Sequence, residues 1–87
     1  MSDEGFPLWR LSFLGRAAEE PLIAHLIQDV RLKVNILQAN IEPLRDQMMG
    51  TMIVEAEGDE QQITQGKNFL LSKGVHVETI GYVRSIN

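Results

Sequence analysis

The chain contains no cysteine, and this absence excludes several kinds of chemistry. None of its 87 residues can form a disulfide, a catalytic thiolate, an iron–sulfur cluster or a cysteine-ligated zinc site. Any function must therefore rest on other side chains.

Basic charge is scarce and dispersed. Twelve Asp and Glu residues outnumber eight Lys and Arg residues, which gives a formal net charge of −4. Nucleic-acid and anionic-membrane surfaces need clustered Lys and Arg, whereas the densest basic pair here is Arg31 and Lys33. We therefore expect neither of these partners.

Long apolar runs are also lacking. No segment approaches the roughly 20 consecutive apolar residues of a membrane span. The opening MSDEGFPLWR has neither the basic leader nor the apolar stretch of a signal peptide. We expect no direct membrane insertion, and we expect the chain to stay in the compartment where it is made.

Catalytic and metal-binding motifs are missing. Gly66 and Lys67 are followed by Asn68, so no P-loop is present, and no serine lies in a G-x-S-x-G context. His25 and His76 have no carboxylate at a spacing typical of a metal site or a general base. The sequence thus predicts a binding domain that is not an enzyme and that holds no metal and no cofactor.

Apolar residues recur with the periods of strands and helices. Trp9, Leu11 and Phe13 alternate with polar residues, as in a half-buried strand. After Pro21, apolar residues are spaced three and four apart, as in an amphipathic helix. The whole pattern predicts strands over residues 8–14, 34–42, 49–57 and 75–83, one helix ending near Arg31, and a second helix between Asp59, as its N-cap, and Gly74.

This order is βαββαβ, the order of an α+β ferredoxin-like fold. Right-handed crossovers would place both helices on one face of a four-stranded antiparallel sheet. We expect one domain over residues 8–83, a disordered or linker segment over residues 1–7, and a tail over residues 84–87. The stripe of the second helix that faces the core is predicted to contain Ile63, Gly66, Leu70 and Leu71, with Phe69 beside it.

The strand over residues 34–42 is predicted to turn Leu37, Ala39 and Ile41 toward the core. The opposite face of the sheet is predicted to be bare and to include Ile36 and Met52. An open apolar patch on so small a domain usually marks an association surface. We therefore expect a homodimer.

Three strand residues need an explanation. Asn35 falls in the apolar phase of a strand predicted to be largely buried, so its amide either ties down the turn before the strand or meets a ligand. Gly50 interrupts a strand, which indicates a bulge, a hairpin end, or the close approach of a ligand or another backbone. Met52 is explained by packing or by contact with a soft apolar ligand.

The segment Asn35-Ile36-Leu37 resembles the signature that gives the NIL domain family its name. The resemblance covers residues 8–83 and is carried by the segments PLIAHLI, NILQANIE, GTMIVEAEG and GVHVETIGYV. The third and fourth segments are most similar to the C-terminal regulatory domain of the ATPase subunit of bacterial methionine-import ABC transporters.

The resemblance implies a ferredoxin-like fold related in shape to ACT domains. It also implies that two such domains pair, bind L-methionine at or near their interface, and inhibit import when occupied. ATP hydrolysis would take place in a separate ATPase domain, at the inner, cytoplasmic face of the cell membrane. By resemblance, Asn35 binds or orients the ligand with Ile36 and Leu37 beside it, while Gly50 and Met52 admit its backbone and thioether.

Other interpretations stay open. The chain could be a ligand-free structural homodimerisation module, or a free-standing NIL protein of sulfur amino-acid metabolism. An acylphosphatase-like enzyme is disfavoured, because only Arg16 follows the first strand where a phosphate-binding loop would lie.

Overall fold

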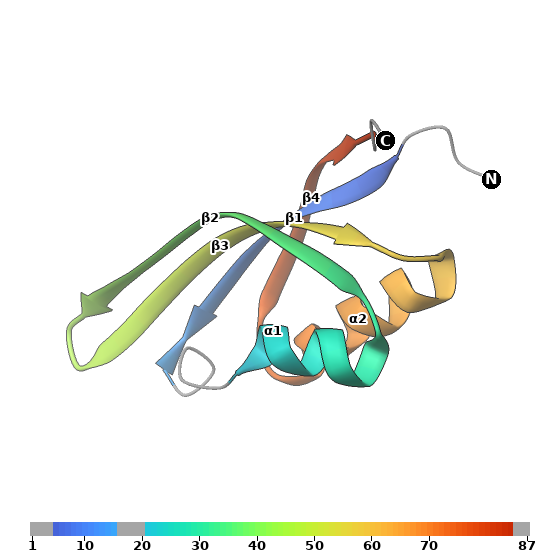
Figure 1. Ribbon diagram of the computed structural model, residues 1–87. Coiled ribbons are helices and arrows are strands. Elements are labelled where there is room, and N and C mark those ends of the chain that lie inside the picture. Colours follow the sequence, from blue (N-terminus) through green and yellow to red (C-terminus); the bar gives the residue numbers. More distant parts are fainter. Residues whose placement is uncertain (1–4, 16–20, 85–87) are drawn as a thin grey trace.

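The computed structural model describes residues 5–15 and 21–84. Its elements are β1 (Phe6–Leu14), α1 (Leu22–His25), η2 (Leu26–Val30), β2 (Lys33–Leu44), β3 (Gln47–Glu57), α2 (Glu60–Ser72) and β4 (His76–Val83). The four strands form one antiparallel sheet in the order β2-β3-β1-β4, and the helices lie on one face of it (Figure 1). The predicted α+β ferredoxin-like fold is confirmed.

Several element bounds differ from the predicted ones. β1 begins at Phe6, two residues before the predicted start, and β2 runs from Lys33 to Leu44, past both predicted ends. Arg16, residues 1–4 of the predicted leading segment and residues 85–87 of the predicted tail lie outside the described residues.

The first helix changes its hydrogen bonding halfway. α1 begins directly after Pro21 and continues as η2, a π-helical segment that ends at Val30. Arg31 then adopts a left-handed conformation, with φ of 62°. This break turns Leu32 into the core, where it is 1% exposed. Neither helix segment here, nor α2, is long and apolar enough to cross a bilayer, among the residues described.

Both ends of α2 follow the prediction. The Asp59 carboxylate accepts a hydrogen bond from the Gln62 backbone N–H at 2.8 Å, and the Gln62 side-chain oxygen accepts one from the Asp59 N–H at 2.9 Å. This reciprocal pair is a capping box. At the other end Gly74 has φ of 80°, a conformation that glycine adopts without strain. The prediction that Leu71 faces the core is wrong, because Leu71 is exposed.

The core lies between the helices and the covered face of the sheet. Its buried members come from β1, α1, η2, β3 and α2 and from the residues just before β2 and β4: Trp9, Leu11, Phe13, Leu22, Leu26, Leu32, Val54, Ala56, Leu70 and Val75. Gly66 lets α2 approach closely, since a Cβ there would lie 2.9 Å from Leu32 Cδ2 and 3.6 Å from Trp9 Cη2.

The register shows which residues share the covered face. Directly paired residues of antiparallel strands project to the same side of a sheet. Buried Val54 pairs with Trp9 and with Ile36, and Met52 pairs with buried Leu11. Ile36 and Met52 therefore lie on the side of the helices, and the prediction that they form the bare face is wrong.

β2 and β3 reach beyond the helices, as Figure 1 shows for the green and yellow strands. We call residues 36–50 of this hairpin the hairpin arm. Its turn is formed by Arg45 and Asp46. The prediction that Leu37, Ala39 and Ile41 pack in the core is wrong: all three are exposed, Leu37 and Ile41 by 53% each.

Candidate functional site

The segment Asn35-Ile36-Leu37 lies in β2, which pairs only with β3 and so forms one edge of the described sheet. Asn35 is exposed, and its side chain forms no hydrogen bond with the described residues. The premise that its amide is buried is therefore wrong, and the amide does not tie down the preceding turn. Its oxygen and NH₂ group are free to meet a ligand.

A β-bulge interrupts β2 at Leu37. Ile36 pairs with Val54 and Gln38 with Ile53, so Leu37 has no partner residue on β3. The extra residue of a bulge is left unpaired, and the side chains beyond it are re-aimed. Leu37 thus presents backbone polar groups and a half-exposed apolar side chain at one place on the sheet.

The bulge also reverses the phase of the strand. Between the hairpin turn and the bulge, Ala39 pairs with Met52 and Ile41 pairs with Gly50, so both project to the side of the helices. Beyond the bulge, Asn35 pairs with Glu55, which lies on the open face. Asn35 consequently projects to the open face and Ile36 to the side of the helices. Simple alternation along the strand predicts the reverse.

Glu55 is a candidate site residue that sequence reasoning missed. It lies directly across from Asn35 and is half-buried. Cβ atoms of such a pair lie about 4.5–5.5 Å apart, so an amide and a carboxylate stand side by side. The two-residue turn at Arg45 and Asp46 fixes the register of the hairpin, but without the bulge that register would place Ala56 opposite Asn35.

Gly50 has a structural explanation. A Cβ at this position would lie 2.2 Å from Phe13 Cε2, so the ring of Phe13 already occupies the space beside the glycine. Phe13 and Gly50 are directly paired across β1 and β3. The glycine therefore admits an aromatic ring of the neighbouring strand.

Met52 is partly buried against the core and pairs with Leu11 and Ala39. The structure thus brings Ile36, Gly50 and Met52 to the side of the helices, and it places Asn35 on the open face. The five predicted site residues do not line one continuous surface of a single chain.

The outer edge of β2 is long and unprotected. An edge strand presents unpaired N–H and C=O groups that can pair with another chain. The apolar side chains around this edge and the hairpin turn are also exposed, namely Ile36, Leu37, Ile41, Leu44 and Met48. Edge and apolar surface together make a candidate association surface, different from the bare sheet face that was predicted.

The chain is similar to known proteins along most of its length. The NIL domain family matches residues 7–79. The methionine import ATP-binding protein MetN of Coxiella burnetii is 43% identical over 81 residues, which are 93% of this chain and 23% of that protein. The protein of the same name from Bacillus subtilis is 35% identical over 71 residues, which are 82% of this chain and 21% of that protein.

A solved structure is similar over most of its length. It is the crystal structure of the C-terminal domain of an ABC transporter ATP-binding protein from Enterococcus faecalis, with a TM-score of 0.74 and 28% identity, covering 88% of this chain and 86% of that one. The chain spans under a quarter of the length of the curated relatives above. Because the family match extends from β1 into β4, the chain belongs to the NIL domain family.

Proposed function

We propose that this chain is a regulatory domain that senses L-methionine and, as part of an ABC-type importer, allosterically inhibits methionine import when occupied. The observation that carries the proposal is the exposure of Asn35 and Leu37 at a bulged edge strand, in a chain whose curated relatives are named methionine import ATP-binding proteins. The domain itself is non-catalytic in this proposal, and ATP is hydrolysed in a separate domain at the cytoplasmic face of the membrane.

The polar groups at the bulge suit the two charged ends of an amino acid. The Asn35 NH₂ group can donate to an α-carboxylate, and the Glu55 carboxylate can accept from an α-ammonium group. Exposed Leu37 offers an apolar contact for the thioether, and its unpaired backbone offers further hydrogen bonds. No cofactor is needed for such binding.

A second copy of the chain completes the site in this proposal. Two β2 edges can pair antiparallel about a two-fold axis, because each copy presents the same row of N–H and C=O groups. Such pairing covers Leu37 and Ile41 and places each Asn35 at or near the interface.

Inhibition then follows from differential affinity. A ligand shifts an equilibrium between two arrangements only as far as it binds one of them more tightly. Methionine at the interface would stabilise the paired domains, and thereby the resting arrangement of the attached ATPase domains.

The test of the ligand is isothermal titration of the purified domain with L-methionine, using Asn35→Ala and a matched Asn40→Ala control. Asn40 is also exposed, on β2, and pairs with Thr51 on the same face as Asn35. We expect saturable heat in the parent and in Asn40→Ala, and at least about tenfold weaker binding in Asn35→Ala, because a charge-assisted hydrogen bond is lost. Equal affinity in the two variants would contradict the assignment of Asn35.

The test of the partner is sedimentation equilibrium of Ile41→Lys beside Leu71→Lys. Both parent side chains are exposed to a similar degree, but Leu71 lies on α2, away from the hairpin arm. We expect only Ile41→Lys to shift the domain toward the monomer, because a charge at the pairing edge opposes association. A dimer that survives Ile41→Lys would place the interface elsewhere.

The exposed hairpin arm also favours a second candidate, a homodimerisation module without a ligand. This candidate shares the predicted dimer and differs in the titration. A stable dimer that gives no heat with L-methionine or close analogues would support it over the sensor.

A further inference from the structure

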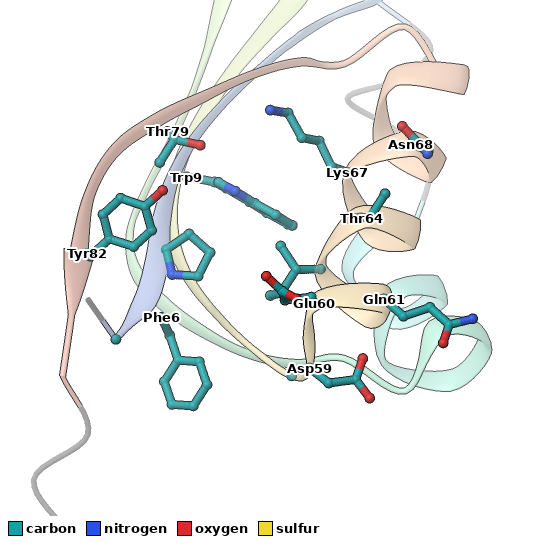
Figure 2. A pocket seen from close by; sticks show the side chains of 14 residues that line it. Phe6, Trp9, Asp59, Glu60, Gln61, Thr64, Lys67, Asn68, Thr79 and Tyr82 are labelled. Carbon is teal, nitrogen blue, oxygen red and sulfur yellow. The ribbon is translucent and has the colours of Figure 1, made fainter. Parts of the chain in front are cut away.

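A groove separate from the hairpin arm opens between α2 and the strands β1 and β4. It has a volume of about 1150 Å³. Figure 2 shows Trp9 on its floor, with Thr79 and Tyr82 of β4 on one side and Lys67 of α2 on the other. Its lining includes none of the residues assigned to methionine above.

Trp9 leaves a hydrogen-bond donor without an acceptor in this groove. The side chain is 1% exposed, and its indole N–H forms no hydrogen bond with the described residues. No polar side-chain atom among those residues is both sealed from solvent and unpaired, so the indole N–H keeps its small remaining contact with the groove. The six-membered end of the ring lies under Gly66, which anchors the indole beneath α2.

A cation, Lys67, lines the same groove as this donor. Lys67 is half-buried and forms no ion pair with the described residues. The Trp9 N–H, the Lys67 ammonium group and the Thr79 hydroxyl give the groove three donors and one positive charge, and Figure 2 shows the Lys67 side chain extending toward the side of Trp9 and Thr79. Three donors lining one groove, one of them charged, suit an anionic oxygen pair such as a carboxylate.

The rest of the groove indicates what carries the carboxylate. Pro7 and Ile63 also line it, which gives an apolar surface next to Trp9. Glu60 lies on the same side of α2 as Lys67. It precedes Lys67 by seven residues, which is about 10 Å along the helix axis. Asp59 lines the groove beside Glu60, so two carboxylates oppose an anion at this end, and the ligand surface between them and Lys67 should be uncharged.

We infer that the groove binds a carboxylate borne by an elongated apolar ligand. Trp9 Nε1, Lys67 Nζ and the Thr79 hydroxyl hold the carboxylate, and the body of the ligand lies over Pro7 and Ile63. The carboxylate can belong to a free organic acid or to the C-terminus of a peptide, since both present the same group. The inference does not depend on methionine sensing.

The chain has a single tryptophan, which makes the site directly observable. The one indole N–H resonance in a ¹H–¹⁵N correlation spectrum would be followed during titration with sodium hexanoate and with hexanamide. We expect a saturable downfield shift of the indole proton with hexanoate only, because the uncharged amide cannot form the ion pair with Lys67.

Three variants test the role of the cation. Lys67→Gln should weaken hexanoate binding by about tenfold, and Lys67→Arg should keep it, because the arginine retains the charge. Lys73→Gln should leave it unchanged, because Lys73, the C-cap of α2, lies over the Phe69 ring and does not line the groove. No shift with hexanoate, an equal shift with hexanamide, or full affinity in Lys67→Gln would overturn the inference.

Two further probes identify the source of the carboxylate. If acetyl-Ala-Leu-Leu with a free C-terminus binds more tightly than hexanoate and its C-terminal amide does not bind, the natural ligand is a peptide terminus. Tighter binding of hexanoate points to a free acid. The hexanoate titration is repeated with Asn35→Ala to separate the two sites. An unchanged indole shift in this variant would show that the groove binds its ligand whether or not the proposed methionine site is intact.

Discussion

The covered part of the sheet and the hairpin arm have the same alternating pattern of apolar residues, yet only the covered part buries them. Trp9 and Leu11 of β1 are each 1% exposed, whereas Ile41 of the arm is 53% exposed. The difference is one of length. A strand of 12 residues such as β2 spans about 40 Å, while a helix of 13 residues such as α2 spans about 20 Å, so the helices cannot cover the whole hairpin.

This comparison teaches that alternation predicts the orientation of a side chain and not its burial. Whether an oriented apolar residue is buried depends on what lies above it. The exposed apolar residues of the hairpin arm, such as Leu37 and Ile41, are not covered by the described chain, which is the reason for proposing a partner there.

The comparison predicts its largest effect for Leu70→Ala set against Ile41→Ala. Leu70 is fully buried, so its truncation should lower the free energy of unfolding by about 2–5 kcal/mol. Ile41→Ala should change it by less than about 0.5 kcal/mol in dilute, monomeric protein, because the side chain is already exposed. Urea denaturation at low protein concentration measures both.

Raising the protein concentration sharpens this result. If the arm pairs with a second copy, the stability of the parent should increase with concentration and that of Ile41→Ala should increase less. A large loss for Ile41→Ala even in the monomer would mean that the arm folds back and is covered by its own chain.

A smaller effect is expected at Gly50, where the covered face meets the arm. Gly50→Ala forces the Phe13 ring to move and should cost about 1–3 kcal/mol. Gly81→Ala is the matched control, because the atom nearest to its Cβ, Leu8 Cδ1, lies 3.9 Å away. Chemical denaturation of both variants gives the difference.

The Phe13→Leu background tests the cause. A smaller side chain there should recover part of the loss in Gly50→Ala, because the two residues are in direct contact and their effects do not add. Additive losses would show that the strain has another origin.

Much of the fold could be predicted because local signals are explicit. Asp59 and Gly74 mark the ends of α2, and the period-two pattern marks β1. The candidate site was harder, because the faces of β2 depend on a bulge. One extra residue at Leu37 exchanges the faces of Asn35 and Ile36, and a strand pattern read with constant alternation does not register it.

Glycine in a strand was also ambiguous in the sequence. Gly50 can be explained by a ligand, a bulge or a neighbouring side chain, and only the pairing of β1 with β3 brings Phe13 opposite it. Long-range register is what local patterns lack. The same register supplies Glu55 as the neighbour of Asn35.

Removing the N-cap of α2 should lower the free energy of unfolding by about 1 kcal/mol. Asp59→Ala removes the acceptor for the Gln62 N–H and half of the capping box, so stability should fall by about 1 kcal/mol. Asp59→Asn keeps an acceptor oxygen and should lose less. Thermal unfolding of both variants distinguishes them, and an unchanged Asp59→Ala would mean that solvent replaces the cap without cost.

The smallest effect is expected on the open face, at the ion pair of Arg10 with Glu78. The two groups lie 3.0 Å apart, with side chains 46% and 51% exposed. Exposed pairs of this kind usually contribute about 0.2–1 kcal/mol, because solvent screens the charges and two long side chains lose freedom. A double-mutant cycle with Arg10→Met and Glu78→Gln should therefore give a coupling energy of that size, reduced in 1 M NaCl, where the Debye length is about 3 Å.

The same cycle tests whether the open face is free. Ser12 and His76, which pair beside the ion pair, add polar side chains to this face. Association through β2 edges leaves the ion pair in water, so its coupling should not depend on protein concentration. A coupling energy that rises well above 1 kcal/mol in concentrated protein would mean that the dimer covers the open face and removes water from the pair, and the arm would then need another partner.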